Sequence, residues 1–191
     1  MEEWIKNYIE VQKKLLGSIP LDQINSIIGT LTDALDKNRQ IFVFGNGGSA
    51  TNSSHFVTDL GKCASDALSK RFICHSLNEN VSWITAVGND DAYEDIYFRQ
   101  LENYANPGDI AITFSVSGNS PNLVKAFKWA KNNGLLTIAF TGLKGGRLAE
   151  IAQQTIIIHS DHYGHVEDMH MMIAHIICYA FIENPEIEIR S

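Results

Sequence analysis

The order of apolar and polar positions divides the chain into a helical opening and a longer part in which strands and helices alternate. Apolar residues recur at helical spacing from Trp4 to Leu16 and again from about Leu21 to Asp36, and Pro20 separates the two segments. After residue 40, short apolar runs typical of buried strands alternate with helical stretches. We expect strands at 41–44, 71–75, 110–114, 136–140 and 155–158, and helices at 50–60, 81–87, 91–104, 121–132, 147–152 and 165–182.

This alternation favours an α/β fold with three αβα layers, in which helices cover both faces of a central five-stranded parallel sheet. A chain of 191 residues suits one domain, so we expect a single domain over residues 1–191. The leading helical pair, within residues 1–37, carries apolar stripes that need a cover. We expect this pair to pack against a partner subunit, because a large exposed apolar patch usually marks an interface.

Composition excludes several classes of function. The net charge is −7, which argues against a nucleic-acid-binding surface because such a surface needs a basic patch. The apolar runs are too short to cross a bilayer, and the acidic start MEEWIKNYIE does not look like a secretory signal. Cys63, Cys74 and Cys178 lack paired spacing, which is typical of free thiols in a reducing compartment. We therefore expect a cytoplasmic protein that binds neither nucleic acid nor membranes.

Two loops follow strands and resemble anion-binding turns. Gly45–Ser49 (GNGGS) comes directly after the first strand, and Ser115–Ser120 (SVSGNS) comes after the third. Ligands of parallel sheets bind beyond the carboxyl ends of the strands, where glycines allow close approach and helix N-termini attract anions. Hydroxyl groups around a glycine suit a phosphate without needing a lysine. Neither loop matches an ATP-binding P-loop or the usual dinucleotide fingerprint.

A second group of residues could hold a metal or move protons. His55 and Asp59 lie four apart on the helix after the first loop, so they share a face. Glu167 and His175 lie two turns apart on the last helix. These four side chains suit zinc or a similar divalent ion, and they equally suit an acid–base pair acting on a sugar. Solvated surface residues are the simpler alternative. Asp90, near an expected helix start, could be an N-cap or a ligand for a sugar hydroxyl.

Taken together, these loops resemble the SIS (sugar isomerase) family, and in particular the bacterial phosphoheptose isomerases. The resemblance extends over nearly the whole chain, from the leading helices through both loops and the turn at Gly88–Asp90 to the last helix. It implies the SIS fold, a homotetramer with active sites at subunit interfaces, and a bound zinc ion. It also implies conversion of sedoheptulose 7-phosphate into D-glycero-D-manno-heptose 7-phosphate, which supplies heptose for lipopolysaccharide or capsule.

The resemblance also assigns roles to residues of this chain. It implies that Asp59 and His175 are catalytic and transfer protons through an enediol. It implies a metal site of four residues: His55, Asp59, Glu167 and His175. It implies substrate contacts for Asn46, Gly47, Ser49, Asp90, Ser115, Ser117, Ser120 and Glu167. Asp59 and Glu167 stand where the family has Glu and Gln, and Val116 and Gly164 stand where it has Thr and Asp.

Three alternatives stay open at this point. The chain could be a non-catalytic SIS protein that binds a replication-initiator partner, although such a relative lacks the metal-site residues. It could sense a sugar phosphate without turning it over. It could also isomerise another sugar phosphate, such as a pentose or hexose phosphate.

Overall fold

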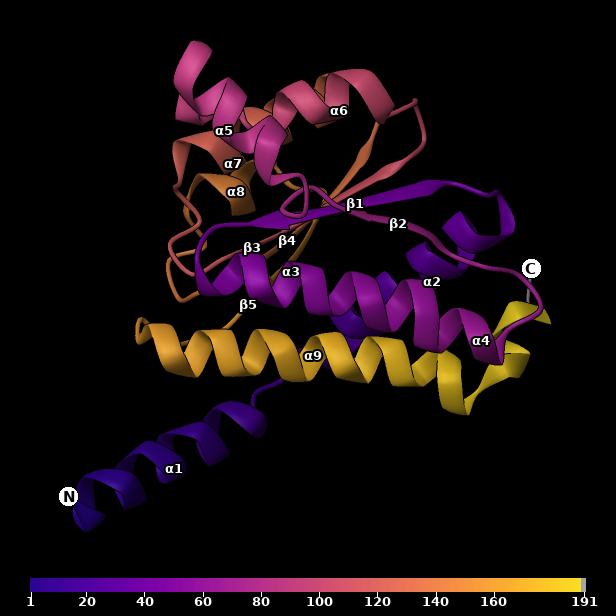
Figure 1. Ribbon diagram of the computed structural model, residues 1–191. Helices are drawn as coiled ribbons and strands as arrows, with labels where there is room; N and C mark the ends of the chain where they lie inside the picture. The colour runs from indigo at the N-terminus through magenta and orange to yellow at the C-terminus, as the bar shows by residue number, and fades with distance from the viewer. Residues whose placement is uncertain (190–191) are drawn as a thin grey trace.

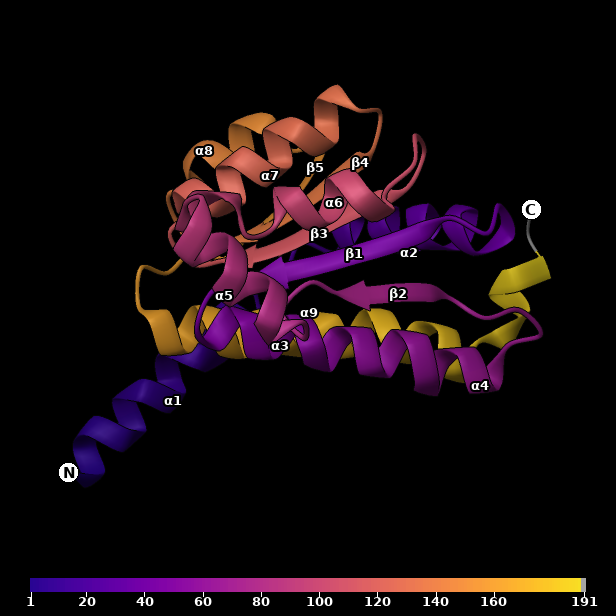
Figure 2. The same ribbon diagram turned by 45° about the horizontal axis from the view of Figure 1, so that its top comes forward.

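The computed structural model describes residues 1–189, and in this part of the chain five parallel strands form a single sheet between two layers of helices (Figures 1 and 2). The strand order is β2-β1-β3-β4-β5, which confirms the expected three-layer fold. Because β1 and β3 are neighbours, the loops that follow them lie at the same edge of the sheet. The strands are β1 Gln40–Gly45, β2 Ile73–Ser76, β3 Ile110–Ser115, β4 Leu136–Thr141 and β5 Gln154–Ile157.

Helices α2, α3 and α9 cover one face of the sheet, and α5 to α8 cover the other (Figure 2). The helices are α1 Glu2–Leu16, α2 Leu21–Asp36, α3 Gly48–Thr58, α4 Ser65–Ala67, α5 Val81–Asp90, α6 Phe98–Tyr104, α7 Pro121–Asn132, α8 Gly146–Ile151 and α9 Tyr163–Glu183. A π-helix, Asp59–Ala64, joins α3 to α4, and 3-10 turns occupy Tyr93–Asp95 and Pro185–Ile189.

Successive side chains of the central strands point to opposite faces of the sheet and form one hydrophobic core on each face. Ile41 and Val43 of β1 pack with α2, α3 and α9, whereas Phe42 and Phe44 pack with α6, α7 and α8. Side chains of a strand point to opposite faces in turn, so a strand covered on both faces must be apolar throughout. The unbroken apolar run at 41–44 therefore follows from burial on both faces.

The expected helix at 91–104 is interrupted. Helix α5 continues to Asp90, and the backbone then leaves the helical region at Asp91 (φ −114°, ψ −96°). A 3-10 turn and the short α6 follow. Asp90 therefore ends a helix, and the expectation that it caps a helix start is wrong.

The two leading helices behave differently. Five side chains of α2 are buried against this chain's own sheet and α9: Ile24, Ile27, Leu31, Ala34 and Leu35. The chain itself therefore covers most of the apolar stripe of α2, and the use of the helical pair in oligomer packing stays a prediction. Helix α1 projects from the body and buries only Leu15 (Figure 1). Its exposed apolar side chains are Trp4, Ile5, Ile9, Val11 and Leu16.

Among residues 1–189, no helix combines the length and the apolar character needed to span a bilayer.

Candidate active site

A small cavity lies at the carboxyl ends of β1 and β3, between their loops and the start of α9. Its volume is about 90 Å³. Six of the predicted substrate-binding residues line it, namely Asn46, Ser49, Ser115, Ser117, Ser120 and Glu167. The other lining residues are Phe114, Val116, Leu123 and Tyr163. We call this cavity the cradle.

The backbone of both loops is shaped by glycines. Gly47 has φ +56°, in the left-handed region that favours glycine, and it turns the chain from β1 into α3. Gly118 has φ +63°, and a Cβ there would lie 2.0 Å from the carbonyl oxygen of Gly145. The second loop can therefore pack against the loop after β4 only because residue 118 has no side chain.

Hydrogen bonds orient the hydroxyl groups of the second loop. Ser115 Oγ accepts the N–H of Gly118 at 3.2 Å, and Ser117 Oγ accepts the N–H of Asn119 at 3.3 Å. A hydroxyl that accepts such a bond keeps its own proton to donate to a ligand. Ser120 is the N-cap of α7, yet its side chain makes no capping bond. These hydroxyls, with the N-termini of α3 and α7 beside them, form a neutral set of donors suited to an anion.

Asn46 serves mainly to hold the first loop in place. Its side-chain amide exchanges two hydrogen bonds with Asn122, at 2.9 and 2.8 Å, and its side-chain oxygen lies 3.2 Å from the Tyr97 hydroxyl. Tyr97 donates its hydroxyl proton to the carbonyl oxygen of Gly45. Burial raises the pKa of Tyr97, so the hydroxyl remains a donor.

Asn78 completes this support. Its side-chain amide donates to the Gly45 carbonyl oxygen and to the Tyr97 hydroxyl, each at 2.8 Å. The sequence predicted neither Asn78, Tyr97 nor Asn122, because the contacts join segments far apart in the chain and no local pattern marks them.

A second group of polar side chains lies where the end of α3 meets α9. Nε2 of His55 is 3.2 Å from Oδ2 of Asp59 and 3.2 Å from Nε2 of His175, and the latter nitrogen is 3.6 Å from the same Asp59 oxygen. Asp59 begins the π-helix, a local widening that is frequent at functional sites. We call these three residues the triad.

The triad has the donor set and the spacing of a metal site. Its ligand atoms all lie within 4.8 Å of one another. Two ligands of a tetrahedral ion with bonds of about 2.0–2.1 Å are about 3.3 Å apart, close to the observed separations. Imidazole nitrogens and a carboxylate oxygen are ligands that divalent transition ions accept. The three residues therefore fit a metal ion without a change of fold.

Glu167 lies with the cradle and not with the triad. It is eight residues before His175 on α9, which corresponds to about 12 Å along the helix axis. The structure thus brings together three of the four predicted metal ligands, and Glu167 as a ligand stays a prediction. Asp90 does not line the cradle; its carboxylate accepts a hydrogen bond from Asn89. Its contact with substrate likewise stays a prediction.

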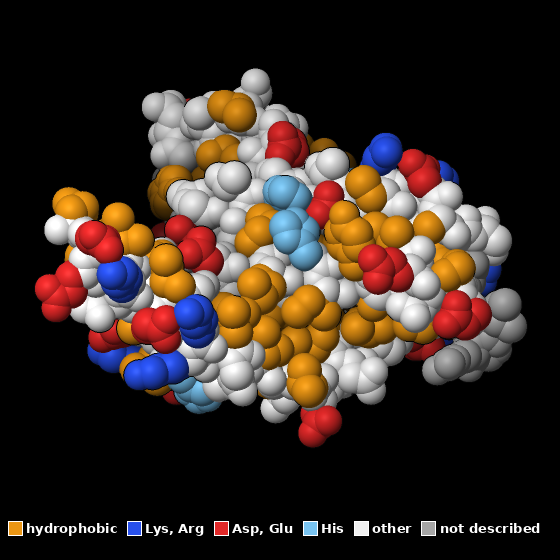
Figure 3. Space-filling model, turned by 90° about the horizontal axis from the view of Figure 1, so that it is seen from below, with side chains coloured by type: hydrophobic (Ala, Val, Ile, Leu, Met, Phe, Trp, Pro, Cys, Tyr) orange, Lys and Arg blue, Asp and Glu red, His pale blue; other side chains and the backbone are white. Residues whose placement is uncertain are grey.

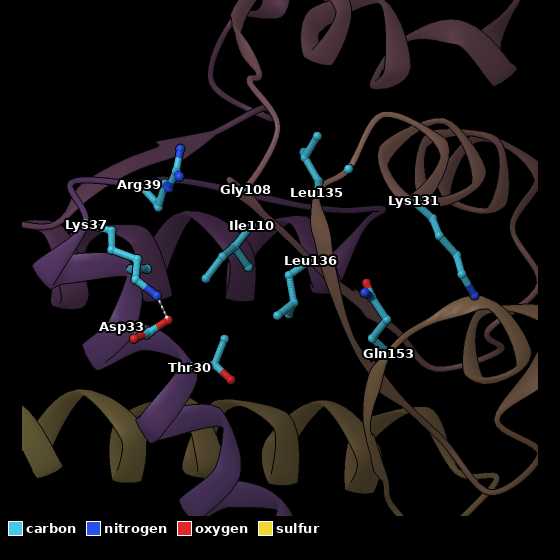
Figure 4. Close-up of a pocket in the computed structure, with 12 residues that line it drawn as sticks. Thr30, Asp33, Lys37, Arg39, Gly108, Ile110, Lys131, Leu135, Leu136 and Gln153 are labelled. Carbon is cyan, nitrogen blue, oxygen red and sulfur yellow. Dashed lines mark hydrogen bonds and ion pairs between the residues drawn. The ribbon is translucent and has the colours of Figure 1, made fainter. Parts of the chain in front are cut away.

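A larger cavity, of about 400 Å³, lies at the opposite edge of the sheet, between α2 and α7 (Figure 4). It contains none of the predicted site residues. Its cations have partners already: Lys37 pairs with Asp33, Arg39 donates to the Pro107 carbonyl and Lys131 to the Ile151 carbonyl. Figure 4 shows that Lys37 and Lys131 lie on different sides of the cavity, with the Lys131 ammonium directed away from its centre. The cavity therefore lacks a converging set of charges.

Comparison with known proteins identifies the family of the chain. The model of the SIS domain family matches residues 3–142. A probable phosphoheptose isomerase of Thermoplasma volcanium is 38% identical over 174 residues, covering 91% of this chain and 88% of that relative. A phosphoheptose isomerase of Akkermansia muciniphila is 36% identical over 187 residues, covering 93% of this chain and 95% of the relative.

Solved structures share the fold. A phosphoheptose isomerase from Neisseria gonorrhoeae has a TM-score of 0.88 at 22% identity, covering 95% of this chain and 98% of that one. A phosphoheptose isomerase from Francisella tularensis has a TM-score of 0.86 at 24% identity, covering 95% and 96%. The chain belongs to the SIS domain family, in the group of the phosphoheptose isomerases.

Proposed function

We propose that the protein is an aldose–ketose isomerase that converts sedoheptulose 7-phosphate into D-glycero-D-manno-heptose 7-phosphate. The observation that carries the proposal is the presence of an anion cradle and an acid–base triad linked by α3 and α9, which border the cradle and carry the two histidines of the triad. The identity of 36–38% with proteins named phosphoheptose isomerase, over more than 90% of this chain, supports the same assignment. These relatives favour an isomerase over the non-catalytic alternatives.

Helices α3 and α9 connect the two groups. The N-terminus of α3 and the start of α9 border the cradle, while His55 near the end of α3 and His175 on α9 belong to the triad. From Ser49 to His55 the helix rises about 9 Å. An extended seven-carbon sugar with its phosphate on C7 and its carbonyl on C2 has a comparable length. A phosphate held in the cradle would thus bring C1 and C2 towards the triad.

The proposed reaction removes a proton from one carbon and adds a proton to its neighbour. The Asp59 carboxylate removes a proton from C1 of the ketose while the C2 oxygen gains one, which gives the enediol. His175 transfers protons at the sugar oxygens, and Asp59, whose carboxylic-acid proton exchanges with solvent, then protonates C2 as the O1–H proton is lost, which leaves an aldehyde at C1. General acid–base catalysis of this kind contributes about 10²–10⁴-fold to a rate.

We propose that the metal of the triad is zinc, held by His55, Asp59 and His175, with Glu167 as a further ligand after a change of its side-chain rotamer. When bound, such an ion would polarise the sugar carbonyl. The ligand types support zinc, since imidazole and carboxylate groups are common zinc ligands.

We also propose that the protein assembles as a homotetramer through α1. Helix α1 exposes apolar side chains, and Met172, Ile176 and Tyr179 of α9 are exposed as well. Figure 3 shows hydrophobic side chains gathered on this face of the molecule, next to exposed histidines. Assembly here would cover the apolar surface and enclose the triad.

The test is turnover of sedoheptulose 7-phosphate by the purified protein, with the product identified by proton NMR. We expect the heptose 7-phosphate aldose, and we expect a chelator to reduce the rate and added zinc to restore it. Conversion of a pentose or hexose phosphate in its place would assign the activity to another sugar. Binding of the sugar phosphate without turnover would support a sensor and contradict the proposal.

A further inference from the structure

A polar side chain of helix α1, Tyr8, ties this helix to the start of α9. The Tyr8 hydroxyl donates to a carboxylate oxygen of Asp168 at 3.1 Å. The Tyr8 ring meets the ring of His165 edge-on at a centroid distance of 4.1 Å and that of His162 at 5.7 Å. His162 is the N-cap of α9, and the other two partners belong to its first turns. We call these four side chains the clasp.

Gly164 makes room for the clasp. A Cβ at this position would lie 2.8 Å from the Tyr8 hydroxyl oxygen and 3.3 Å from a ring carbon of His162. Gly164 does not have a positive φ, so its backbone conformation is open to other residues. What the missing side chain provides is a close approach of Tyr8 to the helix, and a larger residue at position 164 would displace the hydroxyl.

The clasp holds the part of α9 that lines the cradle. Residues four apart share a side of an α-helix. Tyr163 and Glu167 share the side that lines the cradle. Gly164 and Asp168, each one position further along, share the neighbouring side that meets Tyr8. A movement of α9 away from the clasp would therefore also move the two residues that line the cradle.

The cradle is sensitive to small movements of this helix start. A Cβ at Gly48, the first residue of α3, would lie 2.5 Å from a carboxylate oxygen of Glu167, so α9 approaches α3 closely here. The cavity has a volume of only about 90 Å³. Groups that bind a ligand must be held within about 0.5 Å of their productive positions. Loosening the first turns of α9 would therefore weaken binding in the cradle.

We infer that Tyr8 is a positioning residue, which holds Tyr163 and Glu167 in place for the sugar phosphate by fixing the first turns of α9. Tyr8 belongs neither to the cradle nor to the triad, so it acts through α9. Coupling between two sites is reciprocal, so a ligand in the cradle strengthens the docking of α1 in turn. This inference rests on the proposed function, since it assumes that the cradle binds a sugar phosphate.

The first test is amide hydrogen exchange of the intact protein without ligand. Tyr8→Phe keeps the ring and removes the hydroxyl, so we expect the backbone amides of residues 166–170 to exchange at least about threefold faster, as the loss of one exposed hydrogen bond predicts. Tyr104→Phe is the matched control, because it removes the hydroxyl of an exposed tyrosine on α6, on the other face of the sheet. It should leave these amides unchanged. Equal exchange in Tyr8→Phe and in the wild type would overturn the inference.

The second test is steady-state kinetics with sedoheptulose 7-phosphate. We expect Tyr8→Phe to raise KM at least about threefold and to keep kcat within about twofold, because the clasp affects binding and does not include the triad. Asp168→Ala removes the acceptor of the same hydrogen bond and should have the same effect, and combining the two changes should add nothing further. Asp168→Asn keeps an acceptor oxygen and should keep the wild-type KM.

The reciprocal effect is measured by hydrogen exchange with the sugar phosphate present. A saturating concentration should slow the amides of residues 2–16 in the wild type and not in Tyr8→Phe. Additive effects of Tyr8→Phe and Asp168→Ala on KM, or an unchanged KM in Tyr8→Phe, would overturn the inference and leave the proposed function intact. Faster exchange at residues 166–170 in Tyr8→Phe, in a protein that binds the sugar phosphate without isomerising it, would overturn the proposed function alone.

Discussion

His170 is a buried base in the core between α9 and the sheet. Its ring packs against Phe114 and Phe140, and its Nε2 lies 3.3 Å from the carbonyl oxygen of Thr141. Burial lowers the pKa of His170 to about 4, and the contact with Thr141 offsets only part of this shift. The imidazole is therefore neutral in the folded protein and plays a packing role.

This burial predicts an acid-sensitive fold. In the unfolded chain the pKa of His170 returns to about 6.5, so the unfolded state binds the proton more readily, and stability present above pH 6.5 falls as the pH drops towards 4. Between pH 7 and pH 5 the loss is about 2 kcal/mol. Urea unfolding of His170→Met should show a pH dependence weaker by about that amount.

The matched control is His159→Met, which replaces an exposed histidine. It should keep the pH dependence of the wild type. Burial also lowers the pKa of His75 and His165, so the free energy of unfolding depends on pH to some extent in both proteins. An equal pH dependence of that free energy in the wild type and in His170→Met would contradict the account.

At the residue scale, spacing along the sequence predicted the contacts that form within a single helix. His55 and Asp59 are one helical turn apart, so their pairing could be read from the sequence. His175 joins them from 120 residues away, which only a family resemblance could suggest. The position of Glu167 against Gly48 depends on how α9 packs on α3, and spacing along one helix does not contain that information.

Glycines differ in whether the packing of neighbouring elements depends on them. Gly118 needs both its positive φ and the absence of a Cβ, because the loop after β4 lies directly against it. Gly29, in the exposed middle of α2, has nothing within 4 Å of the point where a Cβ would lie. The two positions therefore predict opposite effects of the same substitution.

We expect Gly118→Ala to destabilise the protein by about 2 kcal/mol or more, from backbone strain and overlap with Gly145. Gly29→Ala should stabilise it by about 0.5–1 kcal/mol, because alanine favours the helix. Chemical denaturation of both variants measures the difference. A Gly118→Ala protein as stable as the wild type would mean that the loops are not packed as described.

The elements themselves were largely predictable. Apolar runs predicted the central strands β1, β3 and β4, since buried parallel strands contain few polar residues. The edge strands β2 and β5 are partly exposed, and their bounds were predicted only to within one or two residues. The break after Asp90 and the π-helix at Asp59–Ala64 were missed, because both arise from packing and leave the helical periodicity of the sequence nearly unchanged.

At the scale of the molecule, the other described residues leave most of helix α1 uncovered. Ile5 and Ile9 are about half exposed, although both belong to the apolar stripe of the helix. Tyr8 provides a polar contact to the body, donating to Asp168 at 3.1 Å, and its ring lies 4.1 Å from that of His165. The helix is thus anchored near its middle and presents its apolar side outward.

Replacing both Ile5 and Ile9 by Gln should lower the molar mass of the assembly measured by light scattering, because the substitutions make the exposed stripe polar. The circular dichroism spectrum should stay unchanged, since neither side chain is buried in the chain itself. Val81→Gln, at an exposed apolar residue of α5, is the control and should keep the wild-type mass. An unchanged mass in the α1 variant would place the interface elsewhere.

The most direct test of the account is proton exchange during turnover in deuterated water. With sedoheptulose 7-phosphate, the wild-type protein should form the aldose with deuterium at C2, because the proton that Asp59 takes from C1 exchanges with solvent before a proton is delivered to C2. Asp59→Asn, which keeps the shape of the side chain and removes its basicity, should reduce the rate of turnover and of exchange together by about 10²–10⁴-fold. Full turnover by Asp59→Asn, or an aldose without deuterium from the wild type, would contradict the account.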